Sequence, residues 1–198
     1  MTRADALRNR SAILLATEDL LTRLRPEQIS MEQVAAAAGV GKGTVFHRFG
    51  SRMGLMIALM QERAMALGDS VSSGPPPLGP GAEPEERLLA FLDAVVAVVA
   101  RNKGLLAALG HAVTTAHRLD PDDREAHPVY GFWHAHIAGL LTEARPDLDT
   151  ALLADLLLAP LSSDAILTML ERGESERVAA GLRVTATALL RSGGDHQG

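Results

Sequence analysis

One stretch, residues 29–52, constrains the fold of this chain more than any other; it reads ISMEQVAAAAGVGKGTVFHRFGSR. Ser30 stands where its side chain can cap a helix, and Gln33 follows at the spacing of a capping box. The run of alanines favours a helix, and Gly39 can adopt the positive φ that commonly ends one. A second short helix follows, so the pattern predicts a helix-turn-helix over residues 30–49.

The last part of this stretch, GVGKGTVFHRFGSR, resembles the TetR-family pattern GVSxGx[LIV]Yx[HYR]Fx[SN]K. The resemblance covers about residues 8–67, and the rest of the chain is similar to the family only in being helical. It implies a three-helix DNA-binding domain followed by a larger helical domain that binds a ligand and dimerises. The alternative is a helical hairpin with no role on DNA.

The second helix of the motif carries small and basic residues, which suit the major groove of DNA. Gly43 would permit a close approach, while Thr44 and Lys42 can bond a phosphate or a base edge. Two positions depart from the family pattern: Phe46 replaces a tyrosine that usually binds phosphate, and Gly41 replaces a serine cap. The alternative for the histidine of this helix is a buried structural role. The residues expected to contact DNA are Ser30, Lys42, Gly43, Thr44, Phe46, His47, Arg48 and Arg52.

Charge is distributed unevenly along the chain. Residues 1–67 hold nine Lys or Arg against six Asp or Glu, whereas residues 68–198 hold ten against eighteen, within a net charge of −5. A basic N-terminal part on an acidic body fits a protein that contacts phosphate at one end. The N-terminus lacks the apolar region of a signal peptide, and the longest apolar run, residues 88–100, contains Asp93. We therefore expect a cytoplasmic protein with no membrane partner.

Helical periodicity extends along nearly the whole sequence, which predicts an all-α fold of about nine helices. Gly54 should weaken the start of the fourth helix, and Pro160 should kink the eighth. The helices are expected over roughly residues 5–24, 31–38, 41–49, 52–70, 84–102, 103–117, 127–144, 148–172 and 176–191.

The composition also predicts the domain boundaries. Residues 69–83 are rich in Pro, Gly and Ser, which is typical of a flexible linker. This linker would separate a DNA-binding domain, residues 1–68, from a ligand-binding and dimerisation domain, residues 84–192. We expect residues 193–198 to be a disordered tail.

Aromatic residues are scarce, and three of the four in the second half cluster on the predicted seventh helix near several histidines. Because small-molecule sites are mostly apolar with a few polar groups, this cluster is the candidate effector site. The expected lining residues are Phe91, Tyr130, Trp133 and His134, with core packing as the alternative for each. His127, His134 and His136 do not have the spacing of a metal site, and the chain has no cysteine, so we expect neither a metal nor a cofactor.

The last two predicted helices carry more leucine and valine than a terminal hairpin can bury alone, which favours a homodimer built on a four-helix bundle. The alternative is that these residues belong to the core of one chain. The residues expected at the interface are Leu153, Leu157, Leu161, Val178, Leu182 and Leu189.

These features lead to one functional hypothesis and two rivals. The first is a repressor that binds a palindromic operator in double-stranded DNA and is released by a small-molecule ligand. The second is an activator or a ligand-independent regulator, and the third is a helical enzyme or scaffold with a vestigial motif. The chain contains no nucleophile elbow, P-loop or GxGxxG sequence, so we expect no enzymatic activity.

Overall fold

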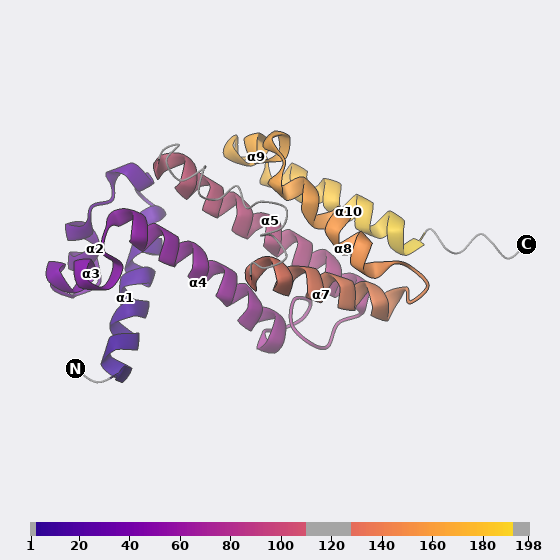
Figure 1. The fold of residues 1–198 in the computed structure, drawn as a ribbon, viewed down its shortest axis with the longest axis horizontal. Helices are drawn as coiled ribbons and strands as arrows, with labels where there is room; N and C mark the ends of the chain where they lie inside the picture. Colours follow the sequence, from indigo (N-terminus) through magenta and orange to yellow (C-terminus); the bar gives the residue numbers. More distant parts are fainter. Residues whose placement is uncertain (1–2, 110–127, 192–198) are drawn as a thin grey trace, which may run out of the picture. The chain divides into compact units, whose positions relative to one another are not determined.

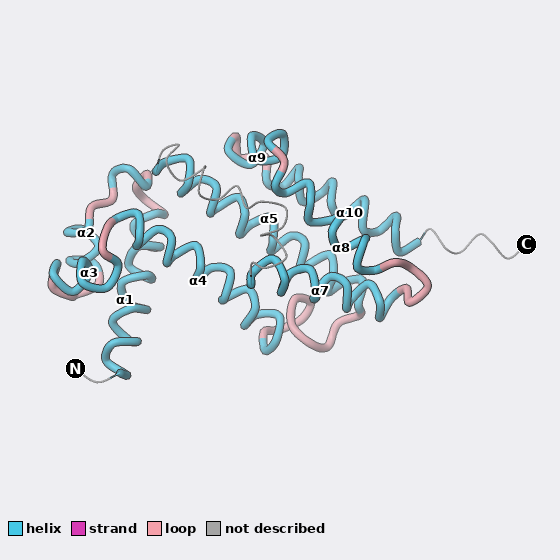
Figure 2. The backbone as a smooth tube through the Cα atoms, viewed as in Figure 1, coloured by secondary structure: helices cyan, strands magenta, loops and turns pink. Residues whose placement is uncertain are grey.

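The computed structural model describes residues 3–109 and 128–191 of the chain. Within these ranges the backbone is helical and contains no strand (Figure 2). The prediction of an all-α chain with about nine helices is therefore confirmed for the described part. The elements, labelled as in Figure 1, are α1 (Arg3–Leu21), η1 (Pro26–Gln28), α2 (Met31–Ala37), α3 (Lys42–Phe49), α4 (Arg52–Ser73), α5 (Pro84–Leu109), α7 (Pro128–Ala144), α8 (Thr150–Leu158), η2 (Ala159–Ser162), α9 (Asp164–Glu171) and α10 (Ser175–Arg191).

The helices fall into two compact units, each described here by itself. Of the described residues, the first unit holds 3–63 and 105–109, and the second holds 64–104 and 128–191. The first unit thus ends within α4, before the domain boundary expected at residue 68. The assignment of one function to residues 1–68 and another to residues 84–192 stays a prediction, and the expected disordered tail lies outside the described residues.

Helix α4 continues to Ser73, beyond its predicted end near residue 70 and into the segment expected to be a linker. Serine is a weak helix former because its hydroxyl competes for backbone groups. Here the hydroxyls bond within the helix, as Ser70 donates to the carbonyl of Ala66 and Ser72 to that of Gly68, both at 2.9 Å. The helix ends before Pro75, which has no backbone N–H to continue it. The prediction of a non-helical linker was therefore wrong for residues 70–73.

Helix α5 passes without a break through residues 102 and 103, where the sequence predicted that one helix ends and another begins. Leu105 is buried in the core of the first unit, so its packing outweighs the low helix propensity of the preceding glycine. The separate helix predicted over residues 103–117 was wrong up to residue 109. Residues 110–117 lie outside the described part.

The predicted eighth helix is not one kinked helix but three elements, α8, η2 and α9. Pro160 cannot donate a backbone hydrogen bond, and the chain tightens there into the 3₁₀ turn η2. Ser163 then caps α9, since its Oγ accepts from the N–H of Ile166 at 3.4 Å. The axis of residues Thr150–Ser162 and the axis of α9, Asp164–Glu171, differ in direction by 56°. No single described helix is long and apolar enough to cross a membrane. Only this bent pair, taken as one segment, reaches the necessary length and apolar composition among the described residues.

The core of the first unit fixes the helix-turn-helix. Arg63 on α4 reaches Glu18 on α1 with two hydrogen bonds, Nε at 2.7 Å and Nη2 at 2.9 Å. The Arg63 side chain is buried, so this pairing offsets much of the cost of removing its charge from water. The largest fully buried side chains of this core are Ile13, Ile29, Leu55, Met56 and Leu59.

The core of the second unit comes from α4, α5, α7, α8 and α10 and is mostly aliphatic. Ala154 on α8 and Ala186 on α10 are fully buried and allow close helix packing. Nη1 of Arg183 on α10 donates to both carboxylate oxygens of Asp93 on α5, at 2.6 and 2.7 Å. Figure 1 shows α8 and α10 running side by side in this unit.

Candidate nucleic-acid interface and effector groove

The N-terminus of α2 is fixed by the predicted capping box. Ser30 Oγ accepts from the N–H of Gln33 at 3.2 Å, and Ser30 N–H donates to Gln33 Oε1 at 2.8 Å. A hydroxyl has one donor and two acceptor positions, so Ser30 can also donate to the Glu32 carboxylate, whose pKa is lowered by hydrogen bonds from Lys42, from its own backbone and from Ser30.

The turn between α2 and α3 has the predicted glycine geometry. Gly39 has a φ of 65°. Its N–H bonds the carbonyl of Ala36 at 3.2 Å, and the N–H of Val40 bonds the carbonyl of Ala35 at 3.0 Å. These two bonds form a Schellman motif, which satisfies the last carbonyls of α2. Val40 is partly buried against the core of the first unit, so the turn sets the angle between the two helices.

Helix α3 is oriented by one buried side chain. Val45 is fully buried in the core, which turns Lys42, Gly43, Phe46 and His47 to the surface. The buried structural role considered for His47 is therefore wrong. Gly41 caps the helix with no side-chain bond, as its residue type dictates.

Two cationic side chains of this region, Lys42 and Arg52, are already engaged. Lys42 Nζ forms an ion pair with Glu32 on α2 and lies 5.5 Å from the centroid of the Phe46 ring. Arg52 Nη1 donates to the backbone carbonyl of Glu27 at 2.9 Å. Arg48 Nε is buried and has no partner among the described residues. The positive surface expected from the sequence is thus partly neutralised within the first unit.

The structure gives a reason for the glycine at the start of α4, while the expectation that Gly54 weakens this turn stays a prediction. Ser51 Oγ accepts from the N–H of Gly54 at 3.1 Å and so caps the helix. A Cβ at Gly54 would lie 2.1 Å from the carbonyl oxygen of Phe49. The glycine is therefore required by a close backbone approach, which a reading of helix propensity alone could not reveal.

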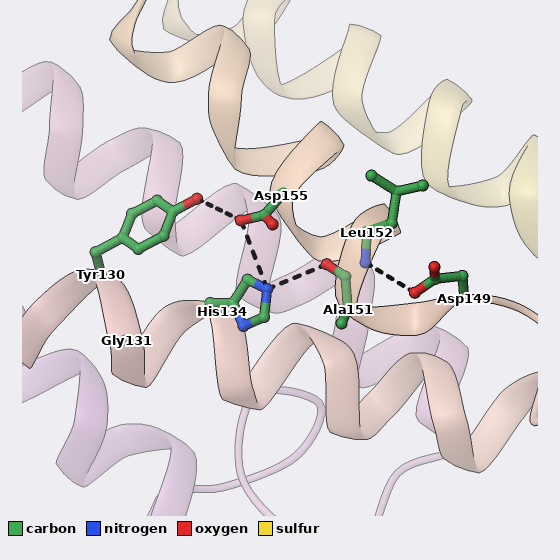
Figure 3. A pocket seen from close by; sticks show the side chains of 7 residues that line it. All are labelled: Tyr130, Gly131, His134, Asp149, Ala151, Leu152 and Asp155. Carbon is green, nitrogen blue, oxygen red and sulfur yellow. Dashed lines mark hydrogen bonds and ion pairs between the residues drawn. The ribbon is translucent and has the colours of Figure 1, made fainter. Parts of the chain in front are cut away.

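A groove of about 470 Å³ lies between α7 and the start of α8 in the second unit (Figure 3). The Tyr130 hydroxyl donates to Asp155 Oδ1 at 2.7 Å, and His134 Nε2 lies 3.5 Å from the same oxygen. His134 Nε2 is also 3.1 Å from the carbonyl of Ala151. The lining residues are Tyr130, Gly131, His134, Asp149, Ala151, Leu152 and Asp155.

Two of the four predicted pocket residues, Tyr130 and His134, line this groove, and the other two do not. Phe91 is fully buried and packs edge-on against His136, with ring centroids 4.6 Å apart. Trp133 is partly buried against the core, and its Nε1 has no partner among the described residues. Burial and the positive charge of Arg87 lower the pKa of His136.

The histidines do not assemble a metal site in the described residues, where no group of three or more His, Asp or Glu is placed to hold an ion. His127 lies outside the described part.

Sequence reasoning missed Asp155 because its contact with Tyr130 depends on how α7 and α8 pack.

The predicted dimer residues are largely core residues of one chain. Leu157, Leu161, Val178 and Leu182 are buried within the second unit, and Leu153 and Leu189 are partly buried against it. The intrachain alternative was therefore right for the first four. The apolar side chains that α8 and α10 expose are instead Leu152, Leu156 and Val184, at 54%, 57% and 71% exposure. Leu152 and Leu156 lie next to the predicted positions Leu153 and Leu157 on α8, and the location of a dimer interface stays a prediction.

Residues 13–59 match the model of the family described as bacterial regulatory proteins, tetR family. Uncharacterized HTH-type transcriptional regulators from two strains of Mycobacterium tuberculosis are each 33% identical over 95 residues, which is 48% of this chain and 46% of the relative. The match thus spans about half the length of these curated relatives. Both relatives are described as transcriptional regulators.

Solved structures share the fold over nearly the whole chain. A TetR-family transcriptional regulator from Rhodococcus sp. has a TM-score of 0.59 at 21% identity, covering 92% of this chain and 98% of that one. One from Mesorhizobium loti has a TM-score of 0.57 at 23% identity, covering 96% and 98%. The fatty acid degradation regulator FadR from Bacillus halodurans has a TM-score of 0.56 at 20% identity, covering 95% and 96%. Residues 13–59 thus match the model of the tetR family of bacterial regulatory proteins, and the chain shares the all-helical fold of solved TetR-family regulators.

Proposed function

We propose that this chain is a sequence-specific DNA-binding transcriptional repressor. Its helix α3 would lie in the major groove. The observation that carries the proposal is the exposed face of α3 in the segment that matches the family model, where Lys42, Gly43, Phe46 and His47 reach the surface. A helix with small and polar residues on its free face fits the groove, and its N-terminal residues are those that contact base edges in helix-turn-helix proteins. Ser30 would add a phosphate contact at the start of α2.

The repressor would act as a homodimer on a palindromic operator. A single small module contacts few bases and binds weakly, so two copies spaced by about 34–36 Å, or a multiple of this distance, are needed for tight binding. The exposed faces of α8 and α10, with Leu152, Leu156 and Val184, support pairing between two copies.

A small-molecule effector would release the dimer from DNA. The groove lined by Tyr130, His134 and Asp155 supports this part of the proposal because it combines aromatic, apolar and carboxylate groups. A ligand that binds one conformation better than the other shifts the equilibrium between them. A small change in the spacing of two recognition helices would then remove base and phosphate contacts together.

A gel-shift titration on the DNA upstream of the gene tests the proposal. We expect a salt-sensitive complex with one preferred fragment, because phosphate contacts release counterions. The double variant Lys42→Ala with His47→Ala should weaken it at least tenfold. Arg23→Ala is the matched control, since Arg23 is an exposed cation paired with Asp19 outside the predicted interface.

Absence of a preferred fragment would contradict the proposed function. A preferred complex that no small molecule dissociates in a thermal-shift and gel-shift screen would favour a ligand-independent regulator instead.

A further inference from the structure

We infer that Glu32 is a specificity-determining residue of the DNA interface, which directs Lys42 away from phosphates and towards neutral acceptors on base edges. The inference rests on the proposed DNA-binding function. It concerns a residue outside the set expected to contact DNA.

The sequence makes this pair prominent. Within residues 30–49 the only Lys or Arg residues are Lys42 and Arg48, and the only acidic residue is Glu32. Lys42 is exposed, whereas Arg48 is half-buried with its Nε inside the unit, and the single carboxylate of residues 30–49 is bonded to Lys42.

The geometry places the pair at the first turns of both helices. Glu32 lies in the first turn of α2 and Lys42 is the first residue of α3. Their side chains are 55% and 56% exposed, so both can meet a DNA surface. The hydrogen bond from Lys42 lowers the pKa of Glu32, which keeps the carboxylate ionised. The Phe46 ring, 5.5 Å from Lys42 Nζ at its centroid, further confines the ammonium.

The pair discriminates between two kinds of acceptor for a simple electrostatic reason. An ammonium has three donors, so Lys42 can bond Glu32 and a second acceptor at once. If the second acceptor is a phosphate, two anions approach one another and their repulsion offsets the new bond. If it is guanine O6 or N7, which are neutral, no such repulsion arises.

Non-specific complexes rest on phosphate contacts, whereas specific complexes add contacts to base edges. The Glu32 carboxylate therefore weakens binding to arbitrary DNA more than binding to the operator. A recognition helix whose first cation is paired in this way gains discrimination at the expense of general affinity.

The test compares wild type with Glu32→Gln on two duplexes: the preferred upstream fragment and a random-sequence duplex of equal length. Since exposed ion pairs contribute little, we expect affinity for the random duplex to rise about two- to fivefold. Its logarithmic salt slope should steepen by about 0.9, as for one more neutralised phosphate. Affinity for the preferred fragment should change less, so the ratio of the two affinities falls.

Asp19→Asn is the matched control, because Asp19 forms an equally exposed ion pair with Arg23 outside the interface. In a Lys42→Ala background, Glu32→Gln should leave the ratio of affinities unchanged, since the effect acts through Lys42. Circular dichroism on each variant checks that the fold is retained, and Glu32→Ala serves as a second variant.

The possible failures are distinct. If wild type prefers no fragment, the proposed function fails. If wild type has a preference and Glu32→Gln raises both affinities by the same factor, or behaves as Asp19→Asn does, the inference about Glu32 is overturned while the proposed function stands.

Discussion

Gly43 on α3 and Gly54 on α4 have opposite surroundings, although both are glycines within helices. A Cβ at Gly43 would meet no described atom within 4 Å, whereas one at Gly54 would lie 2.1 Å from the carbonyl oxygen of Phe49. A side chain at position 54 would thus force the backbone to shift. Around Gly43 there is room for a side chain, so packing within the described residues does not require a glycine there.

Alanine at these two positions should therefore separate stability from binding. Gly54→Ala should lower the free energy of unfolding by roughly 1–3 kcal/mol, because the backbone must shift to admit the methyl group. Gly43→Ala should raise it by up to about 1 kcal/mol through higher helix propensity, yet weaken DNA binding. Urea denaturation and DNA titration measure the two effects, and equal losses of stability in both variants would contradict the expectation.

The residues of the motif show which features a sequence can predict. The capping box of Ser30 and Gln33 and the positive φ of Gly39 depend on neighbours a few positions away, and both were predicted. The partner of Lys42 and the need for glycine at position 54 depend on how two elements approach each other. Local patterns in the sequence do not contain that information.

At the scale of elements, Arg145 joins the end of α7 to the end of α10. It donates to Asp147 at 2.7 and 2.8 Å and to the backbone carbonyl of Leu190 at 2.9 Å. The last carbonyls of a helix lack partners within it. A cation at that end can donate hydrogen bonds to them and also interacts favourably with the helix dipole. The same hydrogen bonds lower the pKa of Asp147 from 3.8 to about 2.

This depressed pKa predicts a specific dependence of stability on pH. The stabilisation from ionised Asp147 is fully present above its unfolded pKa and is lost as the pH falls through about 2. Asp147→Asn should therefore lower the Tm at pH 7, and its difference from wild type should shrink between about pH 4 and pH 2.

Asp149→Asn is the control for this experiment, because Asp149 caps α8 through Leu152 N–H and asparagine caps equally well. It removes the same charge with little effect on Tm. A difference between Asp147→Asn and wild type that stays constant down to pH 2 would contradict the prediction.

The predicted ends of the helices were wrong where tertiary packing or local hydrogen bonds outweighed the helix propensity of the residues. α5 continues past Gly104 because Leu105 is buried, and α4 extends through serines whose hydroxyls bond within the helix. The break at Pro160 was placed correctly, but its extent was not, because Ser163 supplies a new cap and starts a new helix.

At the scale of the whole molecule, the proposed dimer depends on side chains that one chain leaves exposed. Leu156 on α8 and Val184 on α10 are both more than half exposed, unlike the leucines buried between these helices. The prediction that the last helices pair two copies stays a prediction, and amphipathic periodicity could not distinguish a face buried within the chain from an exposed one.

The double variant Leu156→Glu with Val184→Glu should be monomeric, because two facing copies would bring four carboxylates into an apolar contact. Light scattering after size exclusion measures the mass, and DNA binding should fall with dimerisation. Met65→Glu is the control, since Met65 is an exposed apolar residue of α4 in the same unit. A double variant with the mass of a dimer would place the interface elsewhere.

The backbone contact at Gly54 has a consequence for genetics. In a reporter screen for loss of regulation, substitutions at Gly54 and at Lys42 would give the same colony phenotype for unrelated reasons. The first kind would reduce the amount of intact protein in the cell, while the second would leave it unchanged. Immunoblotting each isolate would therefore sort alleles that affect folding from alleles that affect recognition, and a cluster of folding alleles at Gly54 would mark the contact with Phe49.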